Sequence, residues 1–107
     1  MKLSEAIRQG AKLRPQSVGR YFETDDQDET VYASCALGAA HEAVSGNTDT
    51  LELVDHLADE FPELRSFRAQ NPMKQWSDHL WVVITNLNDK QGWSRERIAD
   101  YLETLGY

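Results

Sequence analysis

The stretch Ala33-Ser-Cys-Ala-Leu-Gly-Ala-Ala-His-Glu-Ala-Val44 carries almost only small side chains. Its central alanines follow one another at spacings of three, one and three residues, which places them on one face of a helix. These alanines are Ala36, Ala39, Ala40 and Ala43. Glycine costs a helix about 1 kcal/mol relative to alanine, so Gly38 indicates a neighbour that approaches closely. We therefore expect this helix to organise the fold.

The ends of this helix follow from the residues on either side. Ser34 is expected to cap the N-terminus, because its hydroxyl can accept a hydrogen bond from a free backbone N–H group. Gly46 is expected to end the helix. Further along the chain, bulky apolar side chains are expected to pack on the small face. They are Trp76, Leu80, Trp81 and Ile84.

Upstream, residues 3–14 predict a first helix, with Ser4 as its cap and Pro15 as its stop. Gly10 lies within this helix and is expected to weaken it by about 1 kcal/mol. The segment 18–33 differs in character, because two β-prone runs flank a polar stretch. A small β-hairpin is one prediction for this segment, and an irregular arm is the alternative.

Downstream, Asp49 and Glu52 have the spacing of a capping box in front of a helix over residues 50–60. Pro62 is expected either to end this helix or to start a short further helical turn through Arg68. Apolar residues recur in this part at helical spacing. Those expected to face the core are Leu53, Leu57, Phe61, Leu64 and Phe67.

Two more helices complete the prediction. Ser77 is expected to cap the most apolar helix, from Asp78 to about residue 91. Ser94 is expected to cap the last helix, over residues 95–105. The inward side chains of these two helices are Leu80, Ile84, Leu87, Ile98, Tyr101, Leu102 and Leu105.

These elements predict a mainly α protein, a single compact domain over residues 1–107 with about five helices and a small β-hairpin near residues 18–33. The length suffices for one modest core. No run of about 18 apolar residues is present, so no membrane span is expected. The N-terminus shows no apolar signal core, and Cys35 is the only cysteine. These features favour a cytoplasmic protein.

The net charge of −7 is unevenly distributed along the chain. Residues 1–20 carry five basic residues and one acidic residue, whereas residues 21–63 carry twelve acidic residues and no lysine or arginine. One interpretation is that the basic first helix docks on the acidic middle and the excess charge maintains solubility. The other is an acidic surface for a protein partner or for self-association. Nucleic-acid binding is disfavoured, because phosphate contact needs a basic patch.

Two segments resemble a pattern in small uncharacterised bacterial and phage-borne helical proteins. The segments are Cys35-Ala-Leu-Gly-Ala-Ala40 and Leu87-Asn-Asp-Lys-Gln-Gly-Trp-Ser-Arg-Glu-Arg-Ile-Ala99. The resemblance implies a similar small helical fold. It implies no activity and no functional residue.

The run Trp93-Ser-Arg-Glu-Arg-Ile-Ala-Asp-Tyr-Leu102 is similar to the first helix of many helix-turn-helix motifs. That motif needs a turn and a second helix that enters the DNA groove. The sequence ends at Tyr107, before any second helix, so DNA binding by this route is not expected.

Cys35 is the candidate nucleophile, because a helix N-terminus can lower the pKa of a thiol. A cysteine nucleophile also needs a base within hydrogen-bond reach. His41 lies six residues on, about 240° around an ideal helix, so the two side chains point apart. His56 and His79 could approach only through the tertiary structure. A small buried cysteine in an alanine-rich face is the favoured interpretation.

The histidines and their acidic neighbours are the candidate metal ligands. His56 and Glu60 have an i, i+4 spacing that can hold a divalent ion, but no second matched pair accompanies them. Surface histidines are the favoured interpretation. The polar runs 25–29 and 86–92 lack the ligand and glycine positions of a calcium loop, so they are interpreted as solvated loops.

Three tryptophans are a high number for a chain of 107 residues; they are Trp76, Trp81 and Trp93. Core filling is the favoured role, since aromatic side chains dominate core energetics. The alternative is an exposed aromatic patch for binding, to which residues 20–22 could also contribute.

No glycine-rich phosphate loop, pair of catalytic carboxylates or serine nucleophile motif is visible. We therefore assign no catalytic, cofactor-binding or metal-binding residue from the sequence. The leading hypothesis is a non-enzymatic binding or regulatory protein that uses the acidic region 21–63. The alternative is a small metal-binding protein or cysteine-dependent enzyme.

Overall fold

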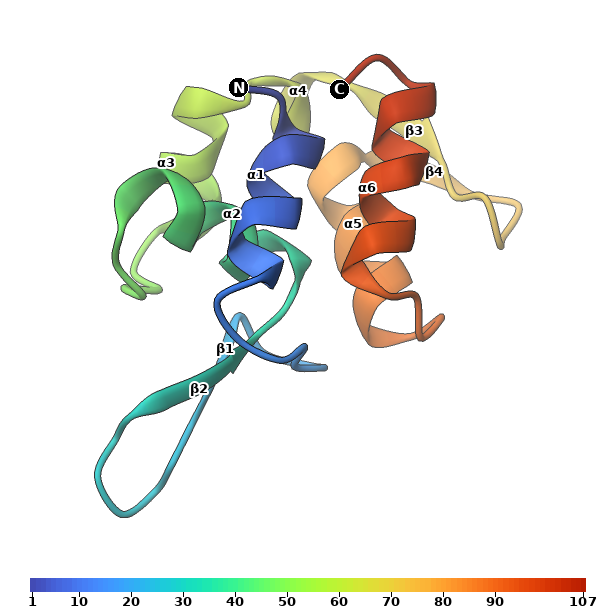
Figure 1. Cartoon of the computed structure of the whole chain (residues 1–107). Coiled ribbons are helices and arrows are strands. Elements are labelled where there is room, and N and C mark those ends of the chain that lie inside the picture. The colour runs from blue at the N-terminus through green and yellow to red at the C-terminus, as the bar shows by residue number, and fades with distance from the viewer.

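Helix α2 (Ala36–Ser45) packs most closely against helix α1 (Leu3–Ala11) in a computed structural model that describes residues 1–107 (Figure 1). The chain forms six helices and two small antiparallel hairpins, which confirms the predicted mainly α fold. Helix α1 also packs against α6. The remaining elements are β1 (Phe22–Thr24), β2 (Val31–Ser34), α3 (Leu53–Glu60), α4 (Glu63–Ser66), β3 (Arg68–Gln70), β4 (Ser77–His79), α5 (Leu80–Asp89) and α6 (Arg95–Thr104).

Two glycines allow α2 to approach its neighbours closely. Gly10 of α1 lies against Ala39, where an added Cβ would lie 2.7 Å from the Ala39 Cα. Gly38 lies against Tyr21, where an added Cβ would lie 3.1 Å from the Tyr21 carbonyl carbon. The close approach predicted at Gly38 is confirmed. The nearest neighbour, however, is the backbone before β1, followed by the Phe22 ring, and none of the bulky residues expected there.

The bulky residues expected on α2 take a smaller part in its packing. Leu80 and Ile84 are fully buried, and α5 does contact α2. Trp76 and Trp81 are only half-buried at the edge of the core. Helix α1, whose glycine permits backbone contact, is therefore the main partner of α2.

Helix α2 begins one residue later than predicted. Its N-cap is Cys35, whose Sγ accepts a hydrogen bond from the Gly38 N–H at 3.4 Å. Ser34 is instead the last residue of β2, and its hydroxyl accepts a hydrogen bond from Arg95. Gly46 ends the helix with a φ of 73°, as predicted.

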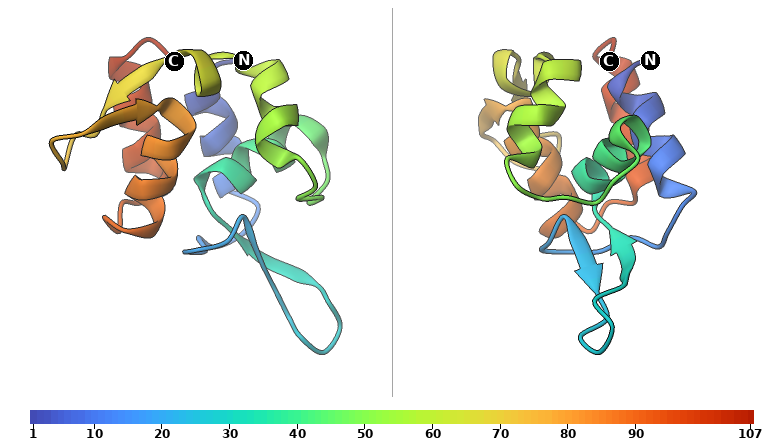
Figure 2. Two further views of the ribbon diagram at one scale, coloured as in Figure 1. Left: turned by 180° about the vertical axis from the view of Figure 1, so that it is seen from behind. Right: turned by 90° about the vertical axis from the view of Figure 1, so that its left-hand side faces the viewer.

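Helix α1 is shorter than the predicted 3–14, because a turn follows Ala11 directly. Ser4 is not its cap. It lies buried in the first turn, where its N–H and its hydroxyl both donate to the Tyr107 carbonyl at 3.1 Å. This contact places the two chain ends side by side (Figures 1 and 2).

The segment 18–33 contains the predicted hairpin, so the irregular-arm alternative is wrong. Strands β1 and β2 pair antiparallel, with Phe22 opposite Ser34 and a bulge after Glu23. The hairpin projects from the helical body in every view (Figures 1 and 2).

The capping box predicted at Asp49 and Glu52 does not form. The Asp49 carboxylate accepts a hydrogen bond from the Leu51 N–H at 3.0 Å, which closes a turn in place of a helix. Glu52 has a φ of 53°, so α3 begins at Leu53. The short helical segment predicted next is present as α4.

The hairpin of β3 and β4 is the element that the sequence did not predict. Ala69 lies opposite Asp78, and each strand has three mostly polar residues, too few for a β pattern. Ser77 therefore lies in a strand and does not cap α5. Helix α5 begins at Leu80 and ends at Asp89, two residues later and two earlier than expected.

The prediction for the last helix is confirmed almost residue by residue. Helix α6 follows Ser94, whose hydroxyl accepts a hydrogen bond from the Arg97 N–H at 3.1 Å, and it ends at Thr104.

Every helix except the short α4 contributes two or more side chains to the core. The fully buried large residues are Leu3, Ile7, Leu37, Leu53, Leu57, Leu64, Leu80, Val83, Ile84, Leu87, Ile98 and Leu102. None of the helices is long and apolar enough to cross a membrane.

Candidate functional site

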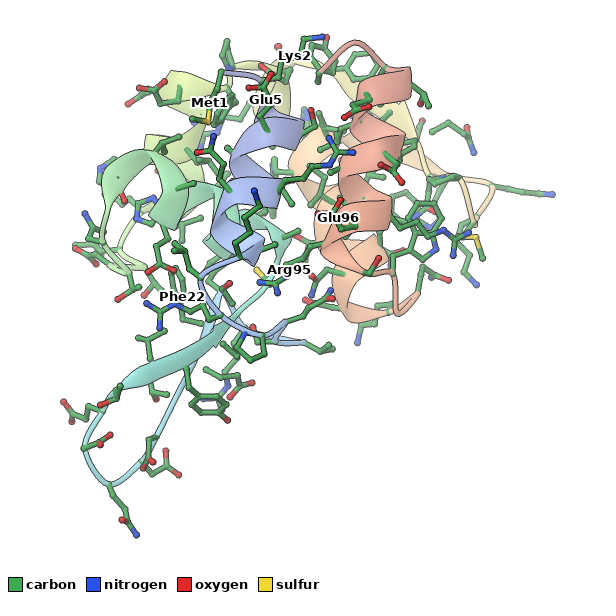
Figure 3. All side chains as sticks on the ribbon, in the orientation of Figure 1. Met1, Lys2, Glu5, Phe22, Arg95 and Glu96 are labelled. Carbon is green, nitrogen blue, oxygen red and sulfur yellow. The ribbon has the colours of Figure 1, made fainter.

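The β1–β2 hairpin holds the most accessible part of the acidic region. Residues 24–30 are all exposed, and carboxylate oxygens surround the tip (Figure 3). None of the hairpin acids forms an ion pair with a basic side chain. These acids are Glu23, Asp25, Asp26, Asp28 and Glu29.

The loop of the hairpin is held by its own hydrogen bonds. The Asp25 carboxylate accepts from the Gln27 N–H at 2.8 Å, and the Asp28 carboxylate accepts from the Thr30 N–H at 3.0 Å. Hydrogen bonds from Thr30 lower the pKa of Asp28 below its usual range. The tip is therefore a defined turn that stays negatively charged at neutral pH.

The base of the hairpin is anchored to the body. Phe22 is buried there (Figure 3), and the Tyr21 carbonyl accepts a hydrogen bond from the Cys35 N–H at 3.0 Å. The Arg14 guanidinium donates to the Val31 carbonyl and binds the Glu42 carboxylate through two hydrogen bonds of 2.8 and 2.6 Å. The direction in which the hairpin leaves the body is thus fixed by several independent contacts.

The interpretation that the basic N-terminal segment neutralises the acidic middle is only partly right. Arg14 does so through Glu42 of α2. Arg8 points the other way, and its guanidinium binds three carboxylates of α6. Those carboxylates belong to Glu96, Asp100 and Glu103. Much of the negative charge of the middle region therefore remains without a basic partner.

A second exposed acidic group lies around α3. Asp49, Glu52, Asp59 and Glu60 are exposed there. Glu52 lies 3.9 Å from the His56 ring nitrogen, and the nearby Asp55 binds Arg65. Apart from Glu42 and Glu63, the acids of residues 21–63 thus form two groups, of which the hairpin group has no cationic neighbour within ion-pair distance.

A pocket of about 490 Å³ opens at the base of the hairpin, between α2, α5 and residues 19–22. Part of its lining is apolar, from Phe22, Leu37, Trp81 and Ile84. The polar part comes from Arg20, Thr50, Thr85, Asn88 and Asp89. Residues 20–22, which the sequence suggested for an aromatic patch, line this pocket.

Asn88 holds the wall of the pocket together. Its buried side-chain oxygen accepts hydrogen bonds from the Ala36 N–H at 3.1 Å and the Gln16 amide at 2.8 Å. Its amide donates to the Ser17 carbonyl at 2.9 Å and to the Asp89 carboxylate at 2.8 Å. The sequence did not reveal this role, because the partners lie 52 or more residues away for every contact except that to Asp89.

Cys35 is buried, as the favoured interpretation of the sequence predicted. Burial raises the pKa of its thiol to about 11, and the hydrogen bond from the Gly38 N–H only partly offsets this effect. The thiol is therefore neutral at neutral pH, which is the opposite of an activated nucleophile. None of the three histidines lines the pocket that Cys35 lines.

The histidines do not converge with other ligands. His41 is buried and its Nε2 lies 3.1 Å from the Asn47 side-chain oxygen. His56 and His79 are exposed. No group of three or more His, Cys, Asp or Glu side chains is arranged to hold a metal ion.

The tryptophans divide between core and edge. Trp93 is buried, with the Arg97 guanidinium 3.9 Å from its ring centroid, and its Nε1–H has no hydrogen-bond partner. Trp76 and Trp81 are half-buried, and Trp81 lines the pocket. Core filling is therefore right for Trp93 and only partly right for the other two.

Comparisons of the chain with protein-family models, with curated proteins and with solved structures gave no significant match.

Proposed function

We propose that this chain is a non-enzymatic binding protein whose acidic β1–β2 hairpin contacts a basic surface of a protein partner. One observation carries the proposal. The hairpin projects from the body and bears five carboxylates with no basic partner (Figures 1 and 3).

The shape of the hairpin supports this role. Its base is fixed by the Arg14 contacts and its loop by the Asp25 and Asp28 turns. A partner that binds an ordered loop does not have to order it, so less conformational entropy is lost on binding. Because the hairpin projects from the helical body, its loop can contact a partner without hindrance from the rest of the protein.

The charge of the hairpin is expected to raise the rate of association more than the affinity of the complex. Complementary charges steer encounter and raise association rates, and salt screens them. A two-stranded arm alone offers a small contact area, which is typical of transient complexes. We therefore expect fast, salt-sensitive binding.

The α3 group of acids is the less favoured contact. Asp55 there is neutralised by Arg65, and Glu52 lies near His56. The α3 acids consequently provide a matched control, because they carry similar charge on the same chain without projecting from it.

The test uses two quadruple variants of equal net charge. The first removes the four charges of the hairpin loop by Asp25→Asn, Asp26→Asn, Asp28→Asn and Glu29→Gln and leaves Glu23 in place. Its asparagines keep the oxygens that accept the loop hydrogen bonds. The second removes α3 charges by Asp49→Asn, Glu52→Gln, Asp59→Asn and Glu60→Gln. Wild type and both variants are used to capture partners from a lysate, and binding of each captured protein is then measured at 50 and 500 mM salt.

The hairpin variant should lose partners that the α3 variant keeps, and wild-type binding should weaken at the higher salt. Equal loss with both variants would show that only net charge matters and would contradict the proposal. Self-association is examined by light scattering at both salt concentrations. A wild-type dimer that the hairpin variant does not form would identify a second copy as the partner.

The alternative function, cysteine chemistry or metal binding, has less support. Cys35 is a neutral buried thiol, and no histidine lines its pocket. The acid and histidine neighbours of α3 do not combine with a third ligand.

A further inference from the structure

The pocket at the base of the hairpin has the size and composition of a small-molecule site. Its volume of about 490 Å³ lies within the range typical of ligand pockets, about 300–1,000 Å³. Phe22, Leu37 and Ile84 make part of it apolar. Such a surface excludes water from an apolar group of a ligand, and polar groups elsewhere in the lining orient it.

Two opposite charges line this pocket, and neither has an ionic partner. Arg20 is exposed, and its guanidinium makes no hydrogen bond or ion pair. Asp89 is half-buried and also lacks an ion pair. The two side chains therefore do not neutralise each other, although they line the same space.

The Asp89 carboxylate is held by hydrogen bonds to one of its oxygens, and the other oxygen is free to accept. Its Oδ1 accepts hydrogen bonds from the Gly19 N–H at 2.9 Å and from the Asn88 amide at 2.8 Å. Its Oδ2 accepts none. Asn88 is itself fixed by three contacts with distant parts of the chain. The carboxylate is thus oriented in advance, which lowers the entropic cost of binding a cation.

We propose that this pocket binds a free α-amino acid with a large apolar side chain. The side chain occupies the apolar part of the pocket, Arg20 binds the carboxylate, and Asp89 binds the ammonium group. A zwitterion is the ligand class that satisfies both charges at once, because a guanidinium fork matches a carboxylate and a carboxylate oxygen accepts from an ammonium group. No bond is made or broken.

The first experiment titrates the intact protein with L-phenylalanine and records amide NMR spectra. Saturable shifts are expected at Gly19, Thr50 and Thr85. The same titration is made with 3-phenylpropionate and with 2-phenylethylamine, which each carry one of the two charges. Both should bind at least about tenfold more weakly, which corresponds to about 1.4 kcal/mol.

Failure to saturate with phenylalanine, leucine or tryptophan up to 10 mM would overturn the proposal. So would equal binding of phenylalanine and 3-phenylpropionate, because Asp89 would then have no role.

The second experiment uses three single variants. Arg20→Gln should weaken phenylalanine binding about tenfold and leave 2-phenylethylamine binding unchanged. Asp89→Asn, which keeps an oxygen for the Gly19 N–H, should weaken phenylalanine binding and leave 3-phenylpropionate unchanged. Arg97→Gln is the control of equal charge change, because Arg97 lies on Trp93 and does not line the pocket.

Arg20 is exposed, so Arg20→Gln is expected to fold. This variant therefore tests the proposed ligand site even if Asp89→Asn is unstable. Wild-type affinity of Arg20→Gln for phenylalanine would refute the assignment. The hairpin charge variants should bind phenylalanine normally, so this proposal and the proposed function can fail separately.

Discussion

Gly10 of α1 lies directly against the main chain of Ala39 of α2, so that a Cβ at position 10 would overlap the Ala39 carbonyl group. This contact joins the first helix to the small-residue helix along their backbones. It explains why alanines fill the opposing face of α2. It also accounts for Gly10, which the sequence alone predicts only to weaken α1.

Replacement of Gly10 by alanine should therefore destabilise the protein. Alanine favours a helix by about 1 kcal/mol over glycine, but overpacking against main-chain atoms costs more, and we expect a net loss of about 1–3 kcal/mol. Urea denaturation measures the change. Gln9→Ala, on the exposed side of α1, is the control and should change the free energy of unfolding by less than about 0.5 kcal/mol. A Gly10→Ala protein as stable as the wild type would disprove the backbone contact.

The second prediction of this kind concerns substitutions of Gly38. An added Cβ would overlap the Tyr21 carbonyl oxygen and lie 3.3 Å from Phe22 Cε1. Gly38→Ala should destabilise by about 1–3 kcal/mol, and Gly38→Leu should cost more. Because the same carbonyl accepts the Cys35 N–H, hydrogen exchange of the Cys35 amide should accelerate in Gly38→Ala. Unchanged exchange together with unchanged stability would exclude close packing at this position.

The contrast between these glycines shows what the sequence could reveal about the fold. A glycine within a run of alanines signals close contact, whereas Gly10 lies among larger residues and gives no such signal. Periodic apolar residues located α6 to within one residue and α5 to within two residues at each end, because their spacing records the buried face directly. The capping box at Asp49 failed because a local turn competes for the same carboxylate.

The candidate pocket was beyond the reach of sequence patterns for a different reason. Arg20 and Asp89 lie far apart in the chain, and only the packing of the hairpin base on α5 brings them to one cavity. Asn88, which fixes that wall, belongs to a polar run interpreted as a solvated loop. The acidic hairpin was the easier prediction, because its charge is contiguous in sequence.

The buried thiol predicts a pH dependence of stability. Cys35 has a pKa of about 11 in the folded protein, against an ordinary value of 9.0. Between these values the unfolded chain loses its proton while the folded chain keeps it, so stability falls as the pH rises from 9 to 11. The loss should reach about 2–3 kcal/mol and level off above pH 11.

The measurement compares unfolding free energies of wild type and Cys35→Ala from pH 7 to 11. The difference between the two proteins should change across this range, because the variant lacks the titrating group. Tyr101, whose pKa burial also raises, titrates in both proteins and largely cancels. Tyr21 cancels only in part, because its pKa is raised by burial and also by the charge of Cys35, which the variant lacks. The thiol should also resist aromatic disulfide reagents at pH 8 until the protein unfolds. Rapid modification of the folded protein would contradict its burial.

The last prediction concerns Arg95, which is labelled in Figure 3. It is a buried side chain whose guanidinium binds carbonyl groups and no carboxylate. It donates to the Arg14 carbonyl at 2.7 Å, to the Ala11 carbonyl at 3.4 Å, and to Ser34. These contacts join the end of α1, the end of β2 and the start of α6, and burial lowers the pKa of the guanidinium below its ordinary value.

Arg95→Met should leave the half-buried Ala11 and Arg14 carbonyls and the buried Ser34 hydroxyl without their Arg95 donor, whereas the Ser34 carbonyl keeps the Ser17 N–H. We expect this loss to cost about 2–4 kcal/mol in urea denaturation. Arg95→Lys should recover only part of this loss, since one ammonium group cannot reproduce the planar fork that reaches Ser34 and Arg14 together. Arg97→Met, two residues on, removes a more exposed guanidinium that stacks on Trp93 and should cost about 1 kcal/mol or less. Full stability of Arg95→Met would mean that water satisfies these carbonyls as well as the arginine does, and the three-way junction would lose its role in holding the hairpin base to the helices.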